Sequence, residues 1–421
     1  MKALSRITAS VCSMIIFASS VSCSQQTVIK KQAEQVEISF SWWGNDARHK
    51  YTLEAIEEFE EKYPNIKVNC SYSEWSGYET RSRVQMISDT EADVMQINYG
   101  WLSEYSEDGL GYYDINELTD YFDITNFSDD FLKYGRKAKH QNAIPIAMNA
   151  QTVYINKTMY DRYGLDVPKT WDDLFKSAEV MREYGVYPLS AASKALWLYA
   201  ITYAEQATGK TILTNGGGLN FNAEDFQVMF DFYKKLVDEK VLPQVEYYER
   251  INLEDELYAG AVAWVSDAVN YFGKAVENGR EIVIADYTTF DGTNTGQGWY
   301  AKPATMYAIS KNTSHPRESA ILLDFLMNSS DMSKLQGLEK GVPLSSSAQQ
   351  SLEKYNMLSG IQYDASKKME ESSVSELNPI LENGDMIDDF FYYANEIIYG
   401  KSESEEASKQ FYSKIKKEHF S

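Results

Sequence analysis

Apolar and polar positions alternate in short runs near the start of the chain, and stretches with a helical period separate these runs. Residues 37–42 alternate as a strand does, whereas residues 50–63 place apolar side chains three or four positions apart among charged ones. The first spacing predicts a strand and the second an amphipathic helix. Strand-like runs at 66–72 and 92–98 enclose another helical stretch at 77–88. This β-α-β-α-β order predicts a mainly parallel sheet with helices on both faces.

Two extended runs further along the chain are longer than one sheet needs. They cover residues 143–156 and 282–309. Thr170 is a good N-cap for a helix over 171–182, and the chain from Ser319 onward is mainly helical in pattern. Long strands of this kind suit crossings between two lobes, so the pattern predicts two lobes joined by a hinge.

The first residues have the pattern of a secretion signal. A positively charged start precedes an apolar core at residues 7–17, which is too short to span a membrane as a permanent helix. A small residue then stands directly before Cys23, which resembles the bacterial lipobox. We therefore expect a signal peptide at 1–22, a lipidated Cys23 and a polar tether at 23–35. The alternative is an ordinary signal peptide with a chance cysteine.

Composition narrows the class of ligand and partner. Only Cys70 would remain free in the mature chain, so no intramolecular disulfide is expected. After removal of the signal, 38 cationic residues face 62 acidic ones, a net charge of −24. This charge argues against nucleic acid and anionic membrane surfaces as partners. The 31 tyrosines and 8 tryptophans suit a site for partly apolar, hydroxyl-rich ligands.

Candidate binding residues concentrate where predicted strands end. Trp42 and Trp43 should point to opposite faces, and Trp43 is the candidate for the ligand side. The turn that follows carries Asn45, Asp46, Arg48 and His49, at the kind of strand end where open α/β sheets bind ligands. A cap on the next helix is the simpler role for Asn45 or Asp46, and a lone histidine is more often structural.

Other candidates share an aromatic or polar side chain in a predicted loop or crossing. Trp75 and Tyr78 are candidates in a loop that enters a helix, and the Trp75 indole is expected to be exposed there. Exposed rings are also expected at Trp299 and Tyr300, in a glycine-rich loop. The remaining candidates are Asn98, Tyr99, Trp101, Asn149, Trp197, Trp264 and Asp267. Carbohydrate recognition uses rings against the apolar faces of sugars and polar side chains on their hydroxyls.

No cofactor or metal motif is apparent. Gly216-Gly217-Gly218 lacks the lysine and the strand-helix context of a phosphate loop. The four histidines have no metal-ligand spacing, and Cys70 has no partner. We expect neither a cofactor nor a metal.

Several segments occur in an order that resembles the extracellular solute-binding proteins of bacterial carbohydrate ABC transporters, a group that includes the maltose-binding protein. The segments are Ala92-Asp-Val-Met-Gln-Ile-Asn98, Tyr154-Ile-Asn-Lys, Pro168-Lys-Thr-Trp, Gly260-Ala-Val-Ala-Trp264 and Tyr307-Ala-Ile-Ser-Lys-Asn312. Each is loose alone, and their order is specific. The resemblance places Trp264 where this family often has a stacking aromatic ring.

This resemblance implies an α/β, two-lobed periplasmic-binding-protein (Venus flytrap) fold of type II. One lobe would contain residues 36–148 and 285–342, and the other 149–284 and 343–421. It implies a monomeric, non-enzymatic protein outside the cytoplasm, held at the cell membrane by its lipid anchor. An oligosaccharide would bind in the cleft between the lobes and pass to the permease subunits of an ABC transporter.

Two other functions stay open from sequence. An extracellular glycosidase or polysaccharide lyase would use paired carboxylates, but no pair stands in a recognisable catalytic context. The same fold could instead bind a peptide, a polyamine or a tyrosine-ligated ferric ion, for which Tyr247-Tyr248 and Tyr392-Tyr393 are the candidate ligands.

Overall fold

The computed structural model describes residues 35–244, 253, 256–267, 272–296, 298–372 and 374–420. In these ranges, no helix combines the length and the apolar character needed to cross a membrane.

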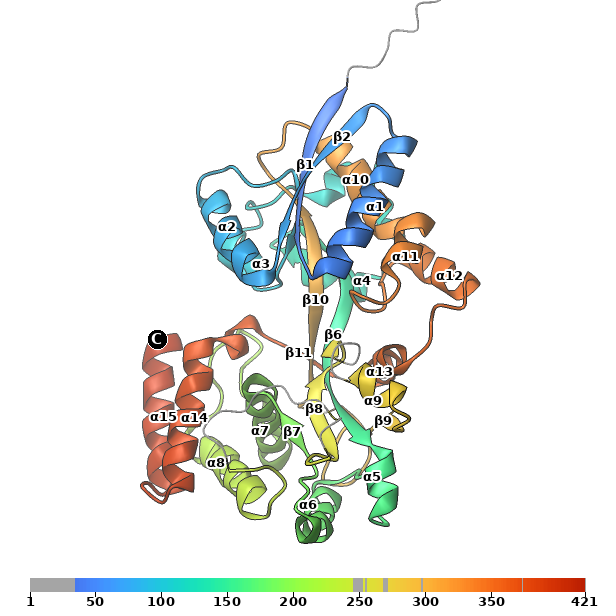
Figure 1. The fold of residues 1–421 in the computed structure, drawn as a ribbon. Helices are drawn as coiled ribbons and strands as arrows, with labels where there is room; N and C mark the ends of the chain where they lie inside the picture. Colours follow the sequence, from blue (N-terminus) through green and yellow to red (C-terminus); the bar gives the residue numbers. More distant parts are fainter. Residues whose placement is uncertain are drawn as a thin grey trace, which may run out of the picture. The chain divides into compact units, whose positions relative to one another are not determined.

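The first part of the sheet is parallel, as predicted. Strand β1 (Val36–Trp43) pairs in parallel with β2 (Ile66–Ser73) and with β3 (Val94–Ile97). Helices α1 (Asp46–Lys62) and α2 (Trp75–Ile87) connect these strands (Figure 1). Since parallel strands end at one edge of a sheet, the carboxyl ends of all three strands meet there.

Two long strands run through the middle of the molecule (Figure 1). They are β6 (Ala143–Asn156) and β10 (Tyr300–Ile309), which pair antiparallel. The strand order is β2-β1-β3-β10-β6-β8-β7. Because β10 enters antiparallel between β3 and β6, the sheet is mixed and not mainly parallel as expected. The α/β class and the crossing strand at 143–156 are confirmed.

The far end of β6 belongs to a second group of elements. It pairs antiparallel with β8 (Gly260–Trp264) and β9 (Ile282–Ile284), and β8 pairs in parallel with β7 (Ser190–Ala191). The extended run near 282–309 contains two separate strands, β9 and β10, with turns and loops between them. A short strand, β11 (Ser375–Glu376), lies along the start of β10.

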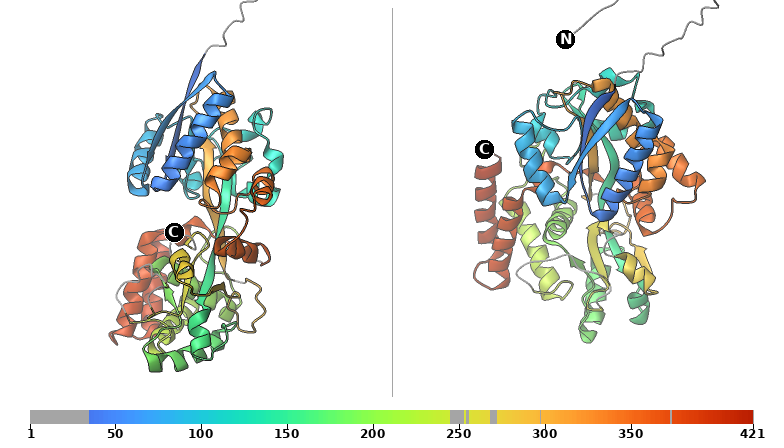
Figure 2. Two further views of the ribbon diagram at one scale, coloured as in Figure 1. Left: turned by 45° about the vertical axis from the view of Figure 1, so that its right-hand side comes forward. Right: turned by 45° about the horizontal axis from the view of Figure 1, so that its top comes forward.

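Helices flank both groups of strands (Figure 2). The predicted helix after Thr170 is confirmed as α6, with a full capping box, and the mainly helical end of the chain is confirmed as α10 to α15. The helices not yet given are α3 (Trp101–Tyr105), α4 (Asp129–Leu132), α5 (Lys157–Arg162), α6 (Trp171–Met181), α7 (Ser193–Thr208), α8 (Ala223–Asp238), α9 (Gly273–Glu277), α10 (Pro316–Asn328), α11 (Ser330–Gln336), α12 (Ser346–Lys354), α13 (Ile361–Glu370), α14 (Gly384–Ile398) and α15 (Ser404–His419).

Separate apolar clusters hold these groups together. One contains Phe40 of β1, Phe59 of α1 and Phe325 of α10. Another gathers the inner faces of α6, α7, α8, α14 and α15, with Trp197 and Phe390 among its members. Separate cores of this kind are what two lobes require.

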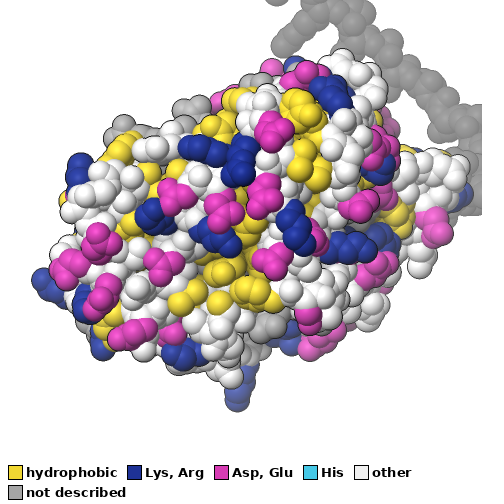
Figure 3. Space-filling view, turned by 90° about the horizontal axis from the view of Figure 1, so that it is seen from below, with side chains coloured by type: hydrophobic (Ala, Val, Ile, Leu, Met, Phe, Trp, Pro, Cys, Tyr) yellow, Lys and Arg dark blue, Asp and Glu magenta, His cyan; other side chains and the backbone are white. Residues whose placement is uncertain are grey.

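Acidic side chains do not form one patch on the face of the molecule that is seen from below in Figure 3. Figure 3 shows basic and acidic side chains interspersed there, with small apolar patches between them. On this face, therefore, neither sign of charge dominates.

Candidate ligand-binding site

An aromatic cluster lies at the carboxyl ends of β1, β2 and β3. The ring of Trp43 is 4.9 Å from that of Trp75 and 5.3 Å from that of Tyr78, measured between centroids, and Trp75 stacks on Trp101 at 6.0 Å. Trp75 is 37% exposed. Trp42 is buried and stacks on Phe40, so the two neighbouring tryptophans do point to opposite faces.

Tyr78 and Trp101 form the buried base of this cluster. The candidate Tyr78 is buried, because α2 begins at Trp75 and carries Tyr78 one turn later against the sheet. Its hydroxyl donates to the carbonyl of Gln96 at 2.7 Å. Trp101 is buried and stacks on Tyr78 at 6.1 Å. Of these rings, Trp75 therefore presents the largest open surface.

The polar turn after β1 is largely engaged in internal contacts. Asn45 is the N-cap of α1, and its side chain accepts from the backbone N–H of Arg48 at 2.9 Å. The Arg48 guanidinium lies 3.3 Å from the carboxylate of Glu339 and donates to the carbonyl of Glu339 at 2.9 Å. Asp46 is exposed in the first turn of α1. The capping role is thus confirmed for Asn45. Arg48 connects α1 to the turn that contains Glu339.

His49 packs as a neutral aromatic ring. Its centroid lies 4.5 Å from that of Tyr72 and 6.3 Å from that of Trp42. Burial lowers its pKa, and the nearby Asp46 only partly opposes this. Its Nδ1 is buried without a hydrogen-bond partner among the described residues. These contacts support the structural role for His49.

Asn98, Tyr99 and Asn149 hold segments together. The Asn98 side chain accepts from the backbone N–H of Gly100 at 2.9 Å, and the Tyr99 hydroxyl donates to the Glu376 carboxylate at 2.6 Å. The Asn149 amide donates to the Ser266 hydroxyl and accepts from the Ser266 N–H, both at 3.0 Å. Asn149 therefore ties crossing strand β6 to the loop after β8.

Trp197 and Trp299 are core residues. Both are 0% exposed. The Trp197 indole donates to the carbonyl of Leu381 at 2.9 Å, and the Trp299 indole donates to that of Thr288 at 3.3 Å. Gly296 and Gly298 have positive φ, and the Trp299 N–H closes a turn onto Gly296. The expected exposure of Trp299 is wrong, because its ring packs inward against other aromatic rings.

Tyr300 is buried as well, against expectation, but it borders a cavity of about 610 Å³. Its hydroxyl donates to the Glu205 carboxylate at 2.7 Å. Burial raises the pKa of Glu205, and this effect outweighs the hydrogen bonds from Tyr300 and the Ile212 N–H. The volume is of the size that small-molecule sites have.

The walls of this larger cavity come from segments of both predicted lobes. Most of their side chains carry a hydroxyl, an amide or a charge, which suits a hydroxyl-rich ligand. The lining residues are Tyr99, Ser103, Lys137, Glu205, Thr211, Ile212, Leu213, Thr214, Asn215, Tyr300, Ser375, Glu376, Asn378, Pro379 and Leu381.

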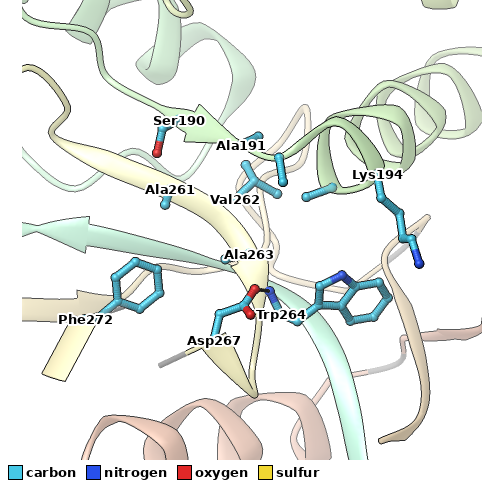
Figure 4. A pocket seen from close by; sticks show the side chains of 11 residues that line it. Ser190, Ala191, Lys194, Ala261, Val262, Ala263, Trp264, Asp267 and Phe272 are labelled. Carbon is cyan, nitrogen blue, oxygen red and sulfur yellow. Dashed lines mark hydrogen bonds between the residues drawn. The ribbon is translucent and has the colours of Figure 1, made fainter. Parts of the chain in front are cut away.

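A smaller cavity of about 100 Å³ lies beside Trp264 (Figure 4). Trp264, Asp267 and Lys194 line it, together with small side chains of β7, β8 and the start of α7. The Asp267 carboxylate accepts from the backbone N–H of Trp264 at 2.9 Å. The structure thus brings the two predicted residues, Trp264 and Asp267, together at one cavity.

Two lysines that the sequence patterns did not indicate stand next to Trp264. Lys194 and Lys302 both donate to the same oxygen of Glu382, at 2.8 and 2.5 Å. The Lys302 Nζ lies 5.3 Å from the centroid of the Trp264 ring. Burial pushes the pKa of Glu382 up, but the two lysines outweigh it, so its pKa is lowered. Burial lowers the pKa of Lys302, and Glu382 opposes this.

No signal along the chain pointed to this triad, because its members come from distant segments. Lys194 belongs to α7, Lys302 to β10, and Glu382 to a 3-10 turn at Pro379–Glu382. Only the pairing of the crossing strands with the neighbouring helices brings them together.

The described ranges contain no group of three His, Cys, Asp or Glu side chains placed to hold a metal ion. Tyr247 and Tyr248, the first tyrosine pair considered for ferric ion, lie outside the described residues. Tyr392 and Tyr393 lie in α14, and Tyr392 is exposed.

Residues 45–332 match the family model described as bacterial extracellular solute-binding protein, so this chain belongs to that family. Among curated relatives, an uncharacterized ABC transporter extracellular-binding protein of Pyrococcus horikoshii is 29% identical over 181 residues. That match spans 40% of this chain and 39% of the relative's length.

Solved structures share the fold over most of the chain. A periplasmic oligogalacturonide-binding protein from Yersinia enterocolitica, in complex with saturated digalacturonic acid, has a TM-score of 0.80 and 29% identity, and the match covers 91% of this chain and 98% of that one. A de novo designed esterase has a TM-score of 0.82 at 29% identity, with 90% and 97% covered. The two-lobed solute-binding fold that the sequence predicted is thereby confirmed.

Proposed function

We propose that this protein captures an oligosaccharide outside the cytoplasm and delivers it to an ABC importer. The observation that carries the proposal is the Trp264 indole beside charged side chains at a cavity, since sugar sites pair a ring surface with polar groups. Family membership and the similarity to a protein that binds digalacturonic acid support the sugar class.

The other parts of the proposal concern location and partners. The mature protein is a monomer held at the cell membrane by a lipid on Cys23, and the tether 23–35 separates it from the bilayer. Its lobes comprise 36–148 with 285–342, and 149–284 with 343–421. The loaded form docks on the permease subunits, and the protein itself does no chemistry on the sugar.

Titration calorimetry of the purified protein against a panel of neutral and acidic mono- and oligosaccharides tests sugar capture. We expect saturable binding to at least one glycan and a weaker affinity for it in Trp264→Ala. A folded protein that binds no glycan of the panel contradicts the proposal. Release of reducing ends from a polysaccharide would instead support the enzyme alternative.

Anchoring has its own test. The full-length protein should sediment with membranes after expression in a bacterial host, whereas Cys23→Ala should not acquire lipid. A lipid label on Cys23→Ala would show that the assignment of the lipidated residue is wrong.

A further inference from the structure

The triad Lys194–Glu382–Lys302 carries more cation than anion. Both ammonium groups donate to one carboxylate oxygen, Glu382 Oε1, at 2.8 and 2.5 Å. One carboxylate therefore pairs with two ammonium groups, which leaves one positive charge in excess, and both ammonium groups keep N–H donors for a further acceptor. Hydrogen bonds between charged groups are among the strongest that proteins form.

One of these lysines is accessible and the other is not. The Lys194 side chain is 43% exposed and lines the Trp264 cavity, whereas that of Lys302 is 15% exposed. Figure 4 shows the Lys194 side chain and the Trp264 indole projecting to the same side. A ligand that stacks on Trp264 can thus reach Lys194 directly, while Lys302 adds its charge from 5.3 Å above the centroid of the ring.

The start of α7 adds positive potential at the same place. Ala192, the N-cap of this helix, has no side-chain oxygen with which to cap it, and Ala192, Lys194 and Ala195 line the cavity. The positive end of the helix dipole favours anions. Among the described residues that line the cavity, Asp267 is the acidic one, and its carboxylate is turned to the Trp264 backbone N–H in Figure 4.

We propose that the cavity beside Trp264 binds the carboxylate of an acidic sugar, with Lys194 and Lys302 as the residues that select it over a neutral sugar. The inference rests on the proposed sugar capture. The apolar face of the pyranose stacks on the Trp264 ring, and its carboxylate accepts from an N–H of Lys194 that Glu382 does not use. No covalent step is involved.

The experiment compares sugars that differ in one functional group. Calorimetry is run with digalacturonic acid, its methyl ester and the galactose disaccharide of the same linkage, and with a glucuronic acid disaccharide beside its glucose counterpart. At least one acid should bind more tightly than its neutral counterpart, by about tenfold or more, as a hydrogen bond between charged groups implies. Its affinity should also fall as salt rises.

Variants then assign the effect to the triad. Lys194→Met should remove most of the preference for the acid and leave the affinity for the neutral sugar nearly unchanged. Lys302→Met should also weaken the preference for the acid. The matched control is Lys234→Met, because the Lys234 side chain is 43% exposed and pairs with Asp238 on α8, and neither residue lines either cavity. Near-ultraviolet circular dichroism checks the fold of each variant.

Each outcome decides the inference. A preference for the acid that Lys194→Met abolishes and Lys234→Met retains supports the inference. Equal or tighter binding of the neutral sugars, or an unchanged preference in Lys194→Met, overturns the acidic-sugar assignment and leaves sugar capture standing. Absence of binding to any glycan overturns sugar capture and this inference together.

Discussion

Burial separates the tryptophans that hold this fold together from those that a ligand can reach. Trp197 and Trp299 donate to backbone carbonyls inside the core, whereas Trp75 keeps an open ring face above Trp101. Trp264 is mostly buried but borders a cavity. The residue type is the same in every case, so the packing around each ring decides its role.

Truncation should separate these roles. Trp197→Ala is expected to lower the free energy of unfolding by about 3–5 kcal/mol, since it empties a packed site and leaves the carbonyl of Leu381 without its donor.

Trp75→Ala should lower the free energy of unfolding by about 1 kcal/mol or less and weaken sugar binding by about 2- to 10-fold. Urea denaturation and calorimetry measure the two effects. A Trp75→Ala protein with wild-type affinity would remove this ring from the site.

Glu205 should make stability depend on pH. Burial raises its pKa above the ordinary value of 4.5, so the folded state binds the proton more tightly than the unfolded chain does. Its contribution to the free energy of unfolding therefore falls as pH rises from about 4.5 through the raised pKa, and is constant above it.

Glu205→Gln lacks this contribution. The free energy of unfolding of the wild type should therefore fall relative to that of the variant as pH rises across that range, and the difference should then level off. Chemical denaturation at a series of pH values measures it. A difference that stays constant from pH 4 to pH 8 would contradict the raised pKa.

At the scale of elements, local patterns predicted helices more reliably than sheet order. The helix after Thr170 begins where its N-cap indicates, and α1 and α2 lie close to their periodic stretches. The direction of β10 depends instead on pairing with β3 and β6, which are distant in sequence. Periodicity carries no information on such pairing.

The capping box of α6 gives a test at this scale. The Thr170 hydroxyl accepts from the N–H of Asp173 at 3.1 Å, and the Asp173 side chain accepts from the N–H of Thr170. Thr170→Ala should lower the free energy of unfolding by about 1 kcal/mol, because it leaves a helix N–H without its acceptor. Thr170→Ser keeps the hydroxyl and should lose much less. Equal losses in both variants would show that the methyl group, and not the cap, matters.

For the whole molecule, sugar binding should be coupled to stability and to the arrangement of the predicted lobes. A ligand present at 100 times its Kd should add about 2.7 kcal/mol to the free energy of unfolding and raise Tm accordingly. Contacts to both lobes would favour a closed form, so small-angle X-ray scattering should show a smaller radius of gyration in the loaded protein. A higher Tm with an unchanged radius would place the ligand on one lobe only.

From the sequence alone, short-range periodicity and caps predicted an α/β fold, and the order of loosely matching segments carried the resemblance to solute-binding proteins. The sequence also indicated Trp264, at the end of one strongly patterned strand, and Asp267, which follows three residues later. Only the tertiary structure decided which aromatic rings are buried, as with Tyr78 and Trp299, and which cations stand beside Trp264. Burial and charge pairing arise from contacts between segments far apart in the chain, and the triad of Lys194, Lys302 and Glu382 exists only where α7, β10 and the turn before α14 meet.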